Sequence, residues 1–314
     1  MNRRIVVVGS LNADLTIYCE RLPLPGETVH GNGFAVNPGG KSANQAVAAS
    51  KLGGTVSLIG AVGNDSNGDM LLASTERAGV DVSRVRRSAD VATGVAVIAV
   101  DANGENNIII SAGANGTLAP ADVSADAFDD AAVLCLCLEV SLETVEAAAK
   151  TAHDAGATVL LNLSPYAEIP QSLAALSDVL LVNAHEASMF LGDAEMPHPG
   201  AHASAWEPVR GQFAERGLHR VLVTLGSHGS VVLDSLAASG EQISRIAPTK
   251  VNAVDTTGAG DAFTGAVAAR LAVGETLAEA AAFASVAAAL ATTKKGTQAA
   301  YPGAEEVLEH LRIS

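Results

Sequence analysis

The chain has 314 residues, of which 48% are hydrophobic and 17% charged, so it can bury a large core and is not an intrinsically disordered protein. Its net charge of −15 argues against a nucleic-acid-binding protein, which needs a basic surface. The negative net charge does not exclude ATP binding, because the phosphates of a nucleotide are held by local loops and not by the net charge of the protein. The three cysteines, Cys19, Cys135 and Cys137, fit neither a disulfide framework nor zinc-ligand spacing.

The N-terminal segment is predicted to be a buried strand at residues 4–9. Its apolar run, residues 5–8, is too short for the core of a signal peptide. The alanine-rich run at residues 280–291 is apolar but too short to span a membrane, so it is predicted to be a buried helix. We therefore expect a cytoplasmic protein with no membrane partner.

Two segments interrupt the expected alternation of strands and helices. The first, about residues 11–36, has short apolar stretches around Pro25-Gly26, which is typical of a β-hairpin. The second, about residues 93–112, contains Asn103-Gly104, a strong tight-turn signal between two apolar stretches. We expect these two excursions to pair into a small sheet that forms a lid beside the main one.

The remainder alternates strands and helices, which indicates a doubly wound α/β fold whose mostly parallel sheet carries helices on both faces. The predicted strands are residues 55–60, 132–138, 158–161, 179–182, 220–224 and 230–233. The predicted helices are residues 42–52, 68–79, 142–155, 186–191 and 206–216, with further helices after Gly260. Residues 197–200 contain two prolines and are a predicted surface loop. We predict one domain over residues 1–314.

The glycines Gly258 and Gly260 precede a predicted helix. They suggest a tight turn whose backbone N–H groups face outward, where the helix dipole also favours an anion. Asp261 follows at the lip of this turn. A carboxylate suits an anion site if the anion is a phosphoryl group in transfer and Asp261 accepts the proton of the attacking hydroxyl. The alternative is a helix-capping aspartate on a glycine-rich turn.

A second glycine pair lies at Gly39-Gly40, before Lys41-Ser42. These letters end like a phosphate-binding P-loop, but Ala35 stands where that motif has its first glycine, and the segment follows a hairpin. Together with Ala43-Asn44-Gln45-Ala46 they resemble the N-terminal signature of the ribokinase-like family of carbohydrate and nucleoside kinases. The stretch at 255–263, Asp-Thr-Thr-Gly-Ala-Gly-Asp-Ala-Phe, resembles the C-terminal signature of the same family.

This resemblance implies a sugar site near the first strand. Asn12 and Asp14 follow that strand, where open α/β sheets bind ligands, although both residues are also common turn formers. Glu139 ends the strand at 132–138 and is either a ligand or merely solvated. The family usually has glycine where Ser42 stands here. The implied sugar-binding residues are Asn12, Ala13, Asp14, Gly40, Lys41, Ser42, Ala43, Asn44, Glu139 and Asp261.

The resemblance also implies an ATP site. Asn183 and Glu186 match the family's Asn-x-x-Glu motif, in which the glutamate helps to hold Mg²⁺ through water. The same two residues equally predict a capping box at a helix start. The implied ATP-binding residues are Asn183, Glu186, Thr224, Leu225, Gly226, Ser227, His228, Gly229, Gly260 and Ser285. Asp261 is the implied catalytic base, beside the turn Gly258, Ala259 and Gly260.

Lastly, the resemblance implies an activating potassium ion next to the turn. Its implied ligands are Asp255, Thr257, Ala291, Lys294, Gly296 and Ala300. The alternative is that Lys294 and Lys295 form a solvated helix end and supply the positive charge themselves.

The resemblance runs from Val7 to Pro302. It implies ATP-dependent phosphorylation of D-ribose at its 5-hydroxyl. Another sugar or nucleoside kinase of the family, acting on deoxyribose, fructose or a nucleoside, is the first alternative, and a sugar-binding protein without catalysis is the second. Because a small isolated sheet leaves its edges exposed, we also expect a homodimer through the lid.

Overall fold

The computed structural model describes residues 4–313; residues 1–3 and 314, which the predicted 1–314 domain includes, lie outside that range. The main sheet has the strand order β13-β12-β11-β10-β9-β8-β1-β4-β5. Its strands are β1 (Arg4–Val8), β4 (Thr55–Gly63), β5 (Val80–Ser88), β8 (Ala131–Leu136), β9 (Thr158–Asn162), β10 (Val179–Asn183), β11 (Arg220–Thr224), β12 (Ser230–Asp234) and β13 (Ile243–Ile246). Strand β12 runs antiparallel to β11 and β13, and the other neighbours pair in parallel.

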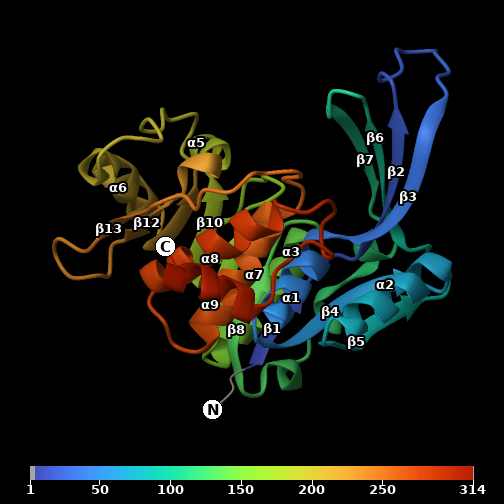
Figure 1. Ribbon diagram of the computed structural model, residues 1–314. Coiled ribbons are helices and arrows are strands. Elements are labelled where there is room, and N and C mark those ends of the chain that lie inside the picture. Colours follow the sequence, from blue (N-terminus) through green and yellow to red (C-terminus); the bar gives the residue numbers. More distant parts are fainter. Residues whose placement is uncertain (1–3, 314) are drawn as a thin grey trace.

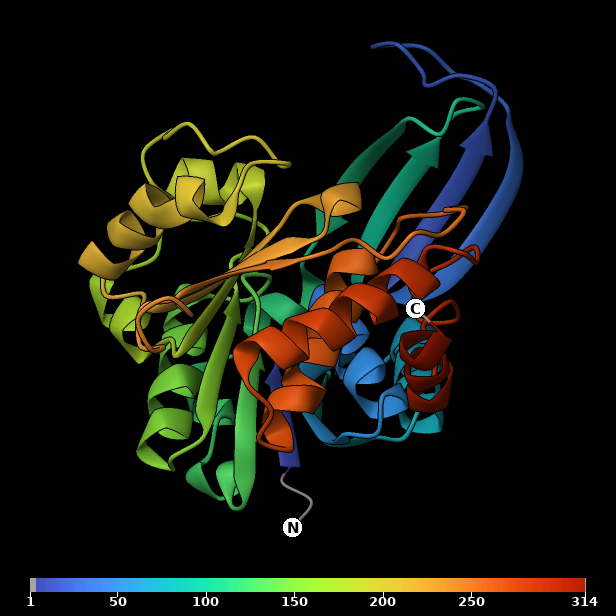
Figure 2. The same cartoon turned by 60° about the vertical axis from the view of Figure 1, so that its left-hand side comes forward.

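Both faces of this sheet are apolar, because its central strands alternate residues between two cores. Ile5 and Val7 pack into one core, and Val6 and Val8 into the other. The first is covered by α1 (Lys41–Lys51), α2 (Ser66–Arg77), α7 (Ala259–Ala272), α8 (Leu277–Ala291) and α9 (Ala304–Ile313). The second is covered by α3 (Leu142–Asp154), α4 (Gln171–Leu176), α5 (Ala184–Phe190) and α6 (Glu207–Glu215). Figures 1 and 2 show this layering, which the sequence predicted.

A second, smaller sheet projects from the body (Figure 1). Its strand order is β3-β2-β6-β7. The strands are β2 (Asn12–Cys19), β3 (Gly31–Gly39), β6 (Gly94–Val100) and β7 (Asn106–Ser111). Strand β2 pairs with β3 in the first hairpin and, in parallel, with β6 of the second. The prediction that the two excursions form a separate sheet is confirmed; we call it the small sheet.

Several elements differ from the prediction. Strands β5 and β13, at the two edges of the main sheet, and the short helix α4 were not predicted. Helix α2 begins earlier than predicted because Asp65 caps it, accepting from the Gly68 N–H. The predicted helix at 206–216 is a 3₁₀ turn (Ala203–Trp206) followed by α6, with a proline in the first turn of α6.

None of the helices within residues 4–313 is both long and apolar enough to cross a membrane.

Candidate active site

The candidate site lies at the edge of the main sheet where its parallel strands end. Chain segments leave the carboxyl ends of β1, β8, β10 and β11 here, and α1 and α7 begin here. This is the edge at which open α/β sheets bind ligands. The two glycine-rich turns, 258–260 and 39–40, therefore come together although more than 200 residues separate them in sequence.

The turn before α7 is held from several sides. Gly258 is left-handed, with φ of 73°, and a Cβ atom there would come within 2.3 Å of Thr297 Cγ2, so only glycine fits. The Tyr301 hydroxyl donates to the Gly258 carbonyl at 3.2 Å. The Ala259 N–H donates to the Thr256 carbonyl at 3.2 Å and so closes the turn. The N–H groups of the next two residues lie in the first helical turn, where no intrahelical acceptor exists.

Asp261 is only 7% exposed and is held by two amides. Asn44 Nδ2 donates to Oδ2 and Gln45 Nε2 donates to Oδ1, each at 3.0 Å. Burial raises the pKa of Asp261, and Lys41, Asn44 and Gln45 oppose that rise. Gln298 Nε2 donates to Asn44 Oδ1 at 3.0 Å, so the Asn44 amide is itself oriented. The carboxylate is therefore fixed in direction and supplied with two donors.

Two cavities lie beside this carboxylate, which is in the wall of the smaller one. The larger, about 490 Å³, extends over α7 and α8, and the smaller, about 160 Å³, contains Asp261 and Lys41 in its wall. Thr224 and Gly260 line both cavities. A ligand in the larger cavity can thus reach one in the smaller past the turn before α7.

Most of the predicted ATP-binding residues line these cavities. The larger is lined by Thr224, Gly226, Ser227, Gly229, Gly260 and Ser285 from that set, and the smaller by Asn183, Glu186, Thr224 and Gly260. Two predicted residues are in neither wall. Leu225 is buried in the apolar core, which explains its absence, and His228 ends the 3₁₀ turn Gly226–His228.

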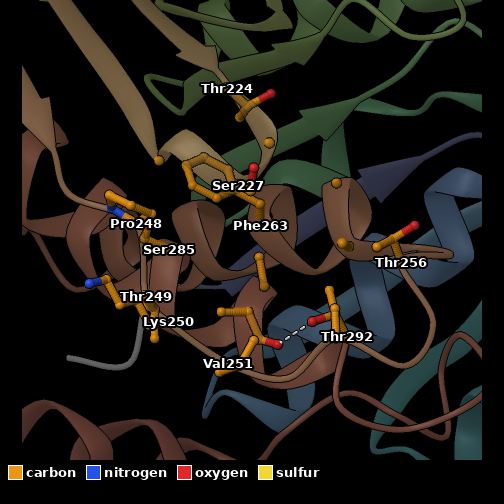
Figure 3. A pocket seen from close by; sticks show the side chains of 17 residues that line it. Thr224, Ser227, Pro248, Thr249, Lys250, Val251, Thr256, Phe263, Ser285 and Thr292 are labelled. Atoms are coloured by element: carbon orange, nitrogen blue, oxygen red, sulfur yellow. Dashed lines mark hydrogen bonds between the residues drawn. The ribbon is translucent and has the colours of Figure 1, made fainter. Parts of the chain in front are cut away.

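Sequence reasoning missed one whole wall of the larger cavity, the segment 248–253. Figure 3 shows Thr249, Lys250 and Val251 of this segment on the side opposite Thr224 and Ser227. The segment has no periodicity that marks it. By contrast, the wall residues Ser285, Ala288 and Ala289 recur at helical spacing along α8 and Thr292 caps its end, so Ser285 could have predicted the others.

Asn183 and Glu186 form the capping box that their spacing predicted. Asn183 Oδ1 accepts from the Glu186 N–H at 2.9 Å, and Glu186 Oε2 accepts from the Asn183 N–H at 2.8 Å. Both also line the smaller cavity, so the cap and a role toward ligand coexist. Two further wall residues were missed, Asn162 at the end of β9 and Ser164 just after it, because that strand carries no recognisable motif.

Asp14, on β2 of the small sheet, lies near the same site. A Cβ atom added to Gly39 would lie 2.2 Å from Asp14 Oδ2, so the Asp14 carboxylate packs directly against Gly39. Burial, with the negative charges of Glu139 and Asp261, raises the pKa of Asp14 to about 7. Asn12 is buried, and its Oδ1 accepts from Asn115 Nδ2 at 2.8 Å. Asn115 is another residue that sequence reasoning missed.

Three other predicted sugar ligands turn their side chains inward. The fully buried Ser42 has its Oγ 3.1 Å from Cys137 Sγ and donates to the Val8 carbonyl at 3.5 Å. Ala13 and Ala43 are fully buried. The replacement of the family's usual glycine by Ser42 is thus accommodated in the core. Any contact of these three residues with a sugar would come from the backbone.

Glu139 connects the site to α1. Its Oε2 accepts from Ser10 Oγ at 2.5 Å and from the Lys41 N–H at 2.9 Å. Gly40, with φ of 89°, brings α1 so close to the β1–β2 connection that a Cβ would lie 2.7 Å from the Asn12 nitrogen. These contacts place the start of α1, and with it Asn44 and Gln45, against Asp261.

Apart from Ala291, which ends α8, the predicted cation ligands lie on two loops that hydrogen bonds join. Asp255 Oδ1 accepts from the Thr257 N–H and Oδ2 from the Gly296 N–H, both at 3.0 Å. Although burial acts to raise it, these bonds lower the pKa of Asp255. Ala291 and Ala300 are buried, whereas Lys294 pairs with Glu306 at 3.4 Å. Within residues 4–313, no group of three His, Cys, Asp or Glu side chains is placed to hold a metal ion.

The chain resembles known proteins over nearly its whole length. The family described as pfkB family carbohydrate kinase matches residues 2–304. A ribokinase of Schizosaccharomyces pombe is 37% identical over 311 residues, covering 96% of each chain. A deoxyribokinase of Salmonella typhi is 35% identical over 313 residues, covering 99% of each. The structure of Arabidopsis thaliana ribokinase complexed with ribose and ATP matches with a TM-score of 0.90 and 32% identity over 100% of both chains.

Proposed function

The chain belongs to the pfkB family of carbohydrate kinases, and we propose that it transfers the γ-phosphoryl group of ATP to the 5-hydroxyl of D-ribose. One observation carries this proposal. The buried Asp261 lines a cavity of about 160 Å³, which shares Thr224 and Gly260 with a cavity of about 490 Å³. The larger has room for a nucleotide. The smaller holds the groups suited to a transferring phosphate and a hydroxyl.

In this proposal each part of the site has one task. Asp261 accepts the proton of the sugar hydroxyl as it attacks, and the Gly260 and Asp261 N–H groups face the charge that develops on the phosphoryl oxygens. Lys41, in the wall of the smaller cavity, adds positive charge there. Mg²⁺ would accompany ATP and neutralise phosphate charge, and Glu186, in the wall of the smaller cavity, would help to hold it through water.

The sugar is proposed to bind between this edge and the small sheet, with Asn12 and Asp14 as ligands and residues 11–36 and 93–112 as the lid. A ribose and a deoxyribose kinase are almost equally similar to the chain. The test is therefore ADP release with D-ribose, 2-deoxy-D-ribose, D-fructose and common nucleosides. We expect kcat/KM to be highest for D-ribose. A higher kcat/KM for another acceptor would make that acceptor the substrate in place of ribose. An absence of turnover with all of them would mean that the protein binds a sugar without catalysis.

Asp14→Ala is expected to raise the KM for ribose by roughly 10–150-fold, because a hydrogen bond to a charged group contributes about 1.5–3 kcal/mol. The KM for ATP should hardly change. Steady-state kinetics with each substrate varied in turn measures both. An equal loss for ATP would make Asp14 a folding residue and not a sugar ligand.

The same carboxylate makes ribose binding pH-dependent. With a pKa of about 7 in the free protein, Asp14 is increasingly protonated below that pH and can no longer accept from two hydroxyls. The KM for ribose should therefore rise as the pH falls from 8 to 6, and this part of the slope should vanish in Asp14→Ala. Glu139 and Asp261 also carry charges near Asp14, and Lys41 carries one near these two. The part of the pH dependence of KM that does not come from Asp14 persists in Asp14→Ala, so the variant separates the two.

A homodimer through the lid is proposed on the surface of the small sheet. Strand register places Ile17, Phe34, Val36, Val97 and Ile109 on the face opposite Asp14. All five are exposed, Phe34 to 65% and Ile109 to 72%. An apolar sheet face with free edges needs a cover, and the same face of a second copy is complementary to it.

We expect light scattering at micromolar concentration to report the mass of two 31.6 kDa chains. Ile109→Lys places a charge on the apolar face, on the edge strand β7, and should yield monomers. The matched control is Leu236→Lys, at a 70% exposed leucine outside the small sheet, which should leave the dimer intact. A monomeric wild-type chain would contradict the proposal.

Potassium is proposed beside the turn before α7, in the loops that Asp255 joins. Backbone carbonyls and one carboxylate suit a large monovalent ion better than a divalent one. The proposed ligands are Asp255, Thr257, Ala291, Lys294, Gly296 and Ala300, of which Lys294 would contribute its carbonyl because its ammonium pairs with Glu306.

A further inference from the structure

Behind the Asp261 carboxylate lies a side chain to which the proposed reaction gives no task. Gln45 is completely buried on the first turns of α1, where a long polar side chain needs partners for both ends of its amide. It has them. Nε2 donates to Asp261 Oδ1 at 3.0 Å, and Oε1 lies 3.2 Å from Cys135 Sγ, which donates to it.

The direction of this amide is dictated by its partners. An ionised carboxylate can only accept, so the nitrogen of Gln45 must face Asp261 and the oxygen must face Cys135. The thiol then has to keep its proton. Cys135 is fully buried in the middle of the sheet, and burial, followed by the charges of Cys137 and Asp261, raises its pKa. It therefore stays a donor at physiological pH.

Gln45 differs in this respect from Asn44, the other amide on Asp261. Asn44 was assigned to the sugar from its sequence motif and is 6% exposed. Gln45 has no exposed surface, and neither cavity includes it in its wall. Whatever it contributes to the reaction passes through Asp261.

We infer that Gln45, with Cys135 behind it, is a positioning residue that fixes the Asp261 carboxylate in its charged form and in the direction the attacking hydroxyl requires. The inference rests on the proposed function, because it needs Asp261 to be the base. Two amides, one on each carboxylate oxygen, prevent the side chain from rotating. A carboxylate that accepts from two donors is also easier to keep ionised in a buried place.

The test is Gln45→Met, which keeps the length of the side chain and removes the donor. We expect kcat with ribose to fall on the order of tenfold, the effect of one hydrogen bond to a charged group. The KM for ribose should change little, since Gln45 does not touch the sugar. The acid limb of the kcat–pH profile should move to higher pH by roughly one unit, because loss of the donor favours protonated Asp261.

Two variants of Cys135 provide an independent test. Cys135→Ala removes the thiol that orients the Gln45 amide. It should shift the acid limb of the kcat–pH profile to higher pH, to a smaller extent than Gln45→Met. Cys135→Ser retains a donor and should restore the wild-type profile. Ser50→Ala is the matched control: it removes the bond from Ser50 Oγ to the Ala78 carbonyl, 2.9 Å, at the far end of α1, and should leave kcat unchanged.

Thermal unfolding and ADP binding establish that each variant is folded. If Gln45→Met is folded and its kcat and pH profile match the wild type, or if only KM rises, the inference is wrong. If it does not fold, the decision rests on Cys135→Ala against Cys135→Ser, and identical profiles for the two overturn it. Failure of the proposed function looks different: Asp261→Asn would then keep its turnover.

Discussion

Asp261→Asn is expected to lower kcat by roughly 10²–10⁴-fold, the range that general-base catalysis contributes. The carboxylate is buried against two amides in the wall of the smaller cavity, and an asparagine in its place offers no group that can take up the proton. Ribose binding should survive, because an amide oxygen still accepts from the hydroxyl. Single-turnover kinetics combined with ribose titration by calorimetry separates the two quantities.

The control for this variant is Asp178→Asn. The Asp178 carboxylate accepts from the Val159 N–H at 2.8 Å at the opposite edge of the sheet, far from both cavities. It tests what the loss of a structural carboxylate does on its own, and we expect a lower melting temperature with normal kcat. A loss of less than tenfold in Asp261→Asn would remove Asp261 as the base.

Replacing potassium by a bulky organic cation is expected to lower turnover by up to about 10²-fold, with sodium a poor substitute. Removal of one preorganised donor costs about that much. The reason is that hydrogen bonds connect the cation loops to the turn before α7. Val254 and Asp255 donate from their backbones to the Thr292 carbonyl, and Asp255 accepts from Gly296, so the cation loops and the turn before α7 are one connected unit. An ion between them would hold the donors in place.

The measurement is kcat at saturating ribose and Mg-ATP in the three cations, at fixed ionic strength. Asp255→Asn removes the one carboxylate of the proposed site. It should lower kcat in potassium and abolish the difference between the cations. Equal wild-type rates in all three cations would end the potassium proposal, and Lys294 and Lys295 would then be the positive charge near the turn.

The layered fold was predictable because its signals are local and periodic. The apolar strands and the turn pairs Pro25-Gly26 and Asn103-Gly104 predicted both sheets. The elements that were missed lack such signals: β5 carries three arginines along an edge, and β13 is a four-residue strand whose pairing with β12 depends on tertiary contacts. Edge strands need less apolar surface, so periodicity is a weak guide to them.

The site was predictable only where glycines and carboxylates formed long signatures. The stretch at 255–263 led to Asp261 directly. The partners of Asp261 were less visible, because the contacts of Gln45 and Gln298 with this site join residues more than 200 positions apart in sequence. Likewise, the inward direction of Ser42 follows from its contacts with Val8 at the end of β1 and with Cys137 just after β8, which no local pattern contains.

The proposed reaction moves phosphate from ATP to one particular hydroxyl of ribose. The most direct measurement follows ATP consumption and the product by ³¹P and ¹³C NMR, with D-ribose and with 5-deoxy-D-ribose, which lacks that hydroxyl. We predict one ADP per ribose, with phosphate coupled to carbon 5, while 5-deoxy-D-ribose binds and competes but gives no product. Phosphate on another carbon, or turnover of 5-deoxy-D-ribose, would contradict it.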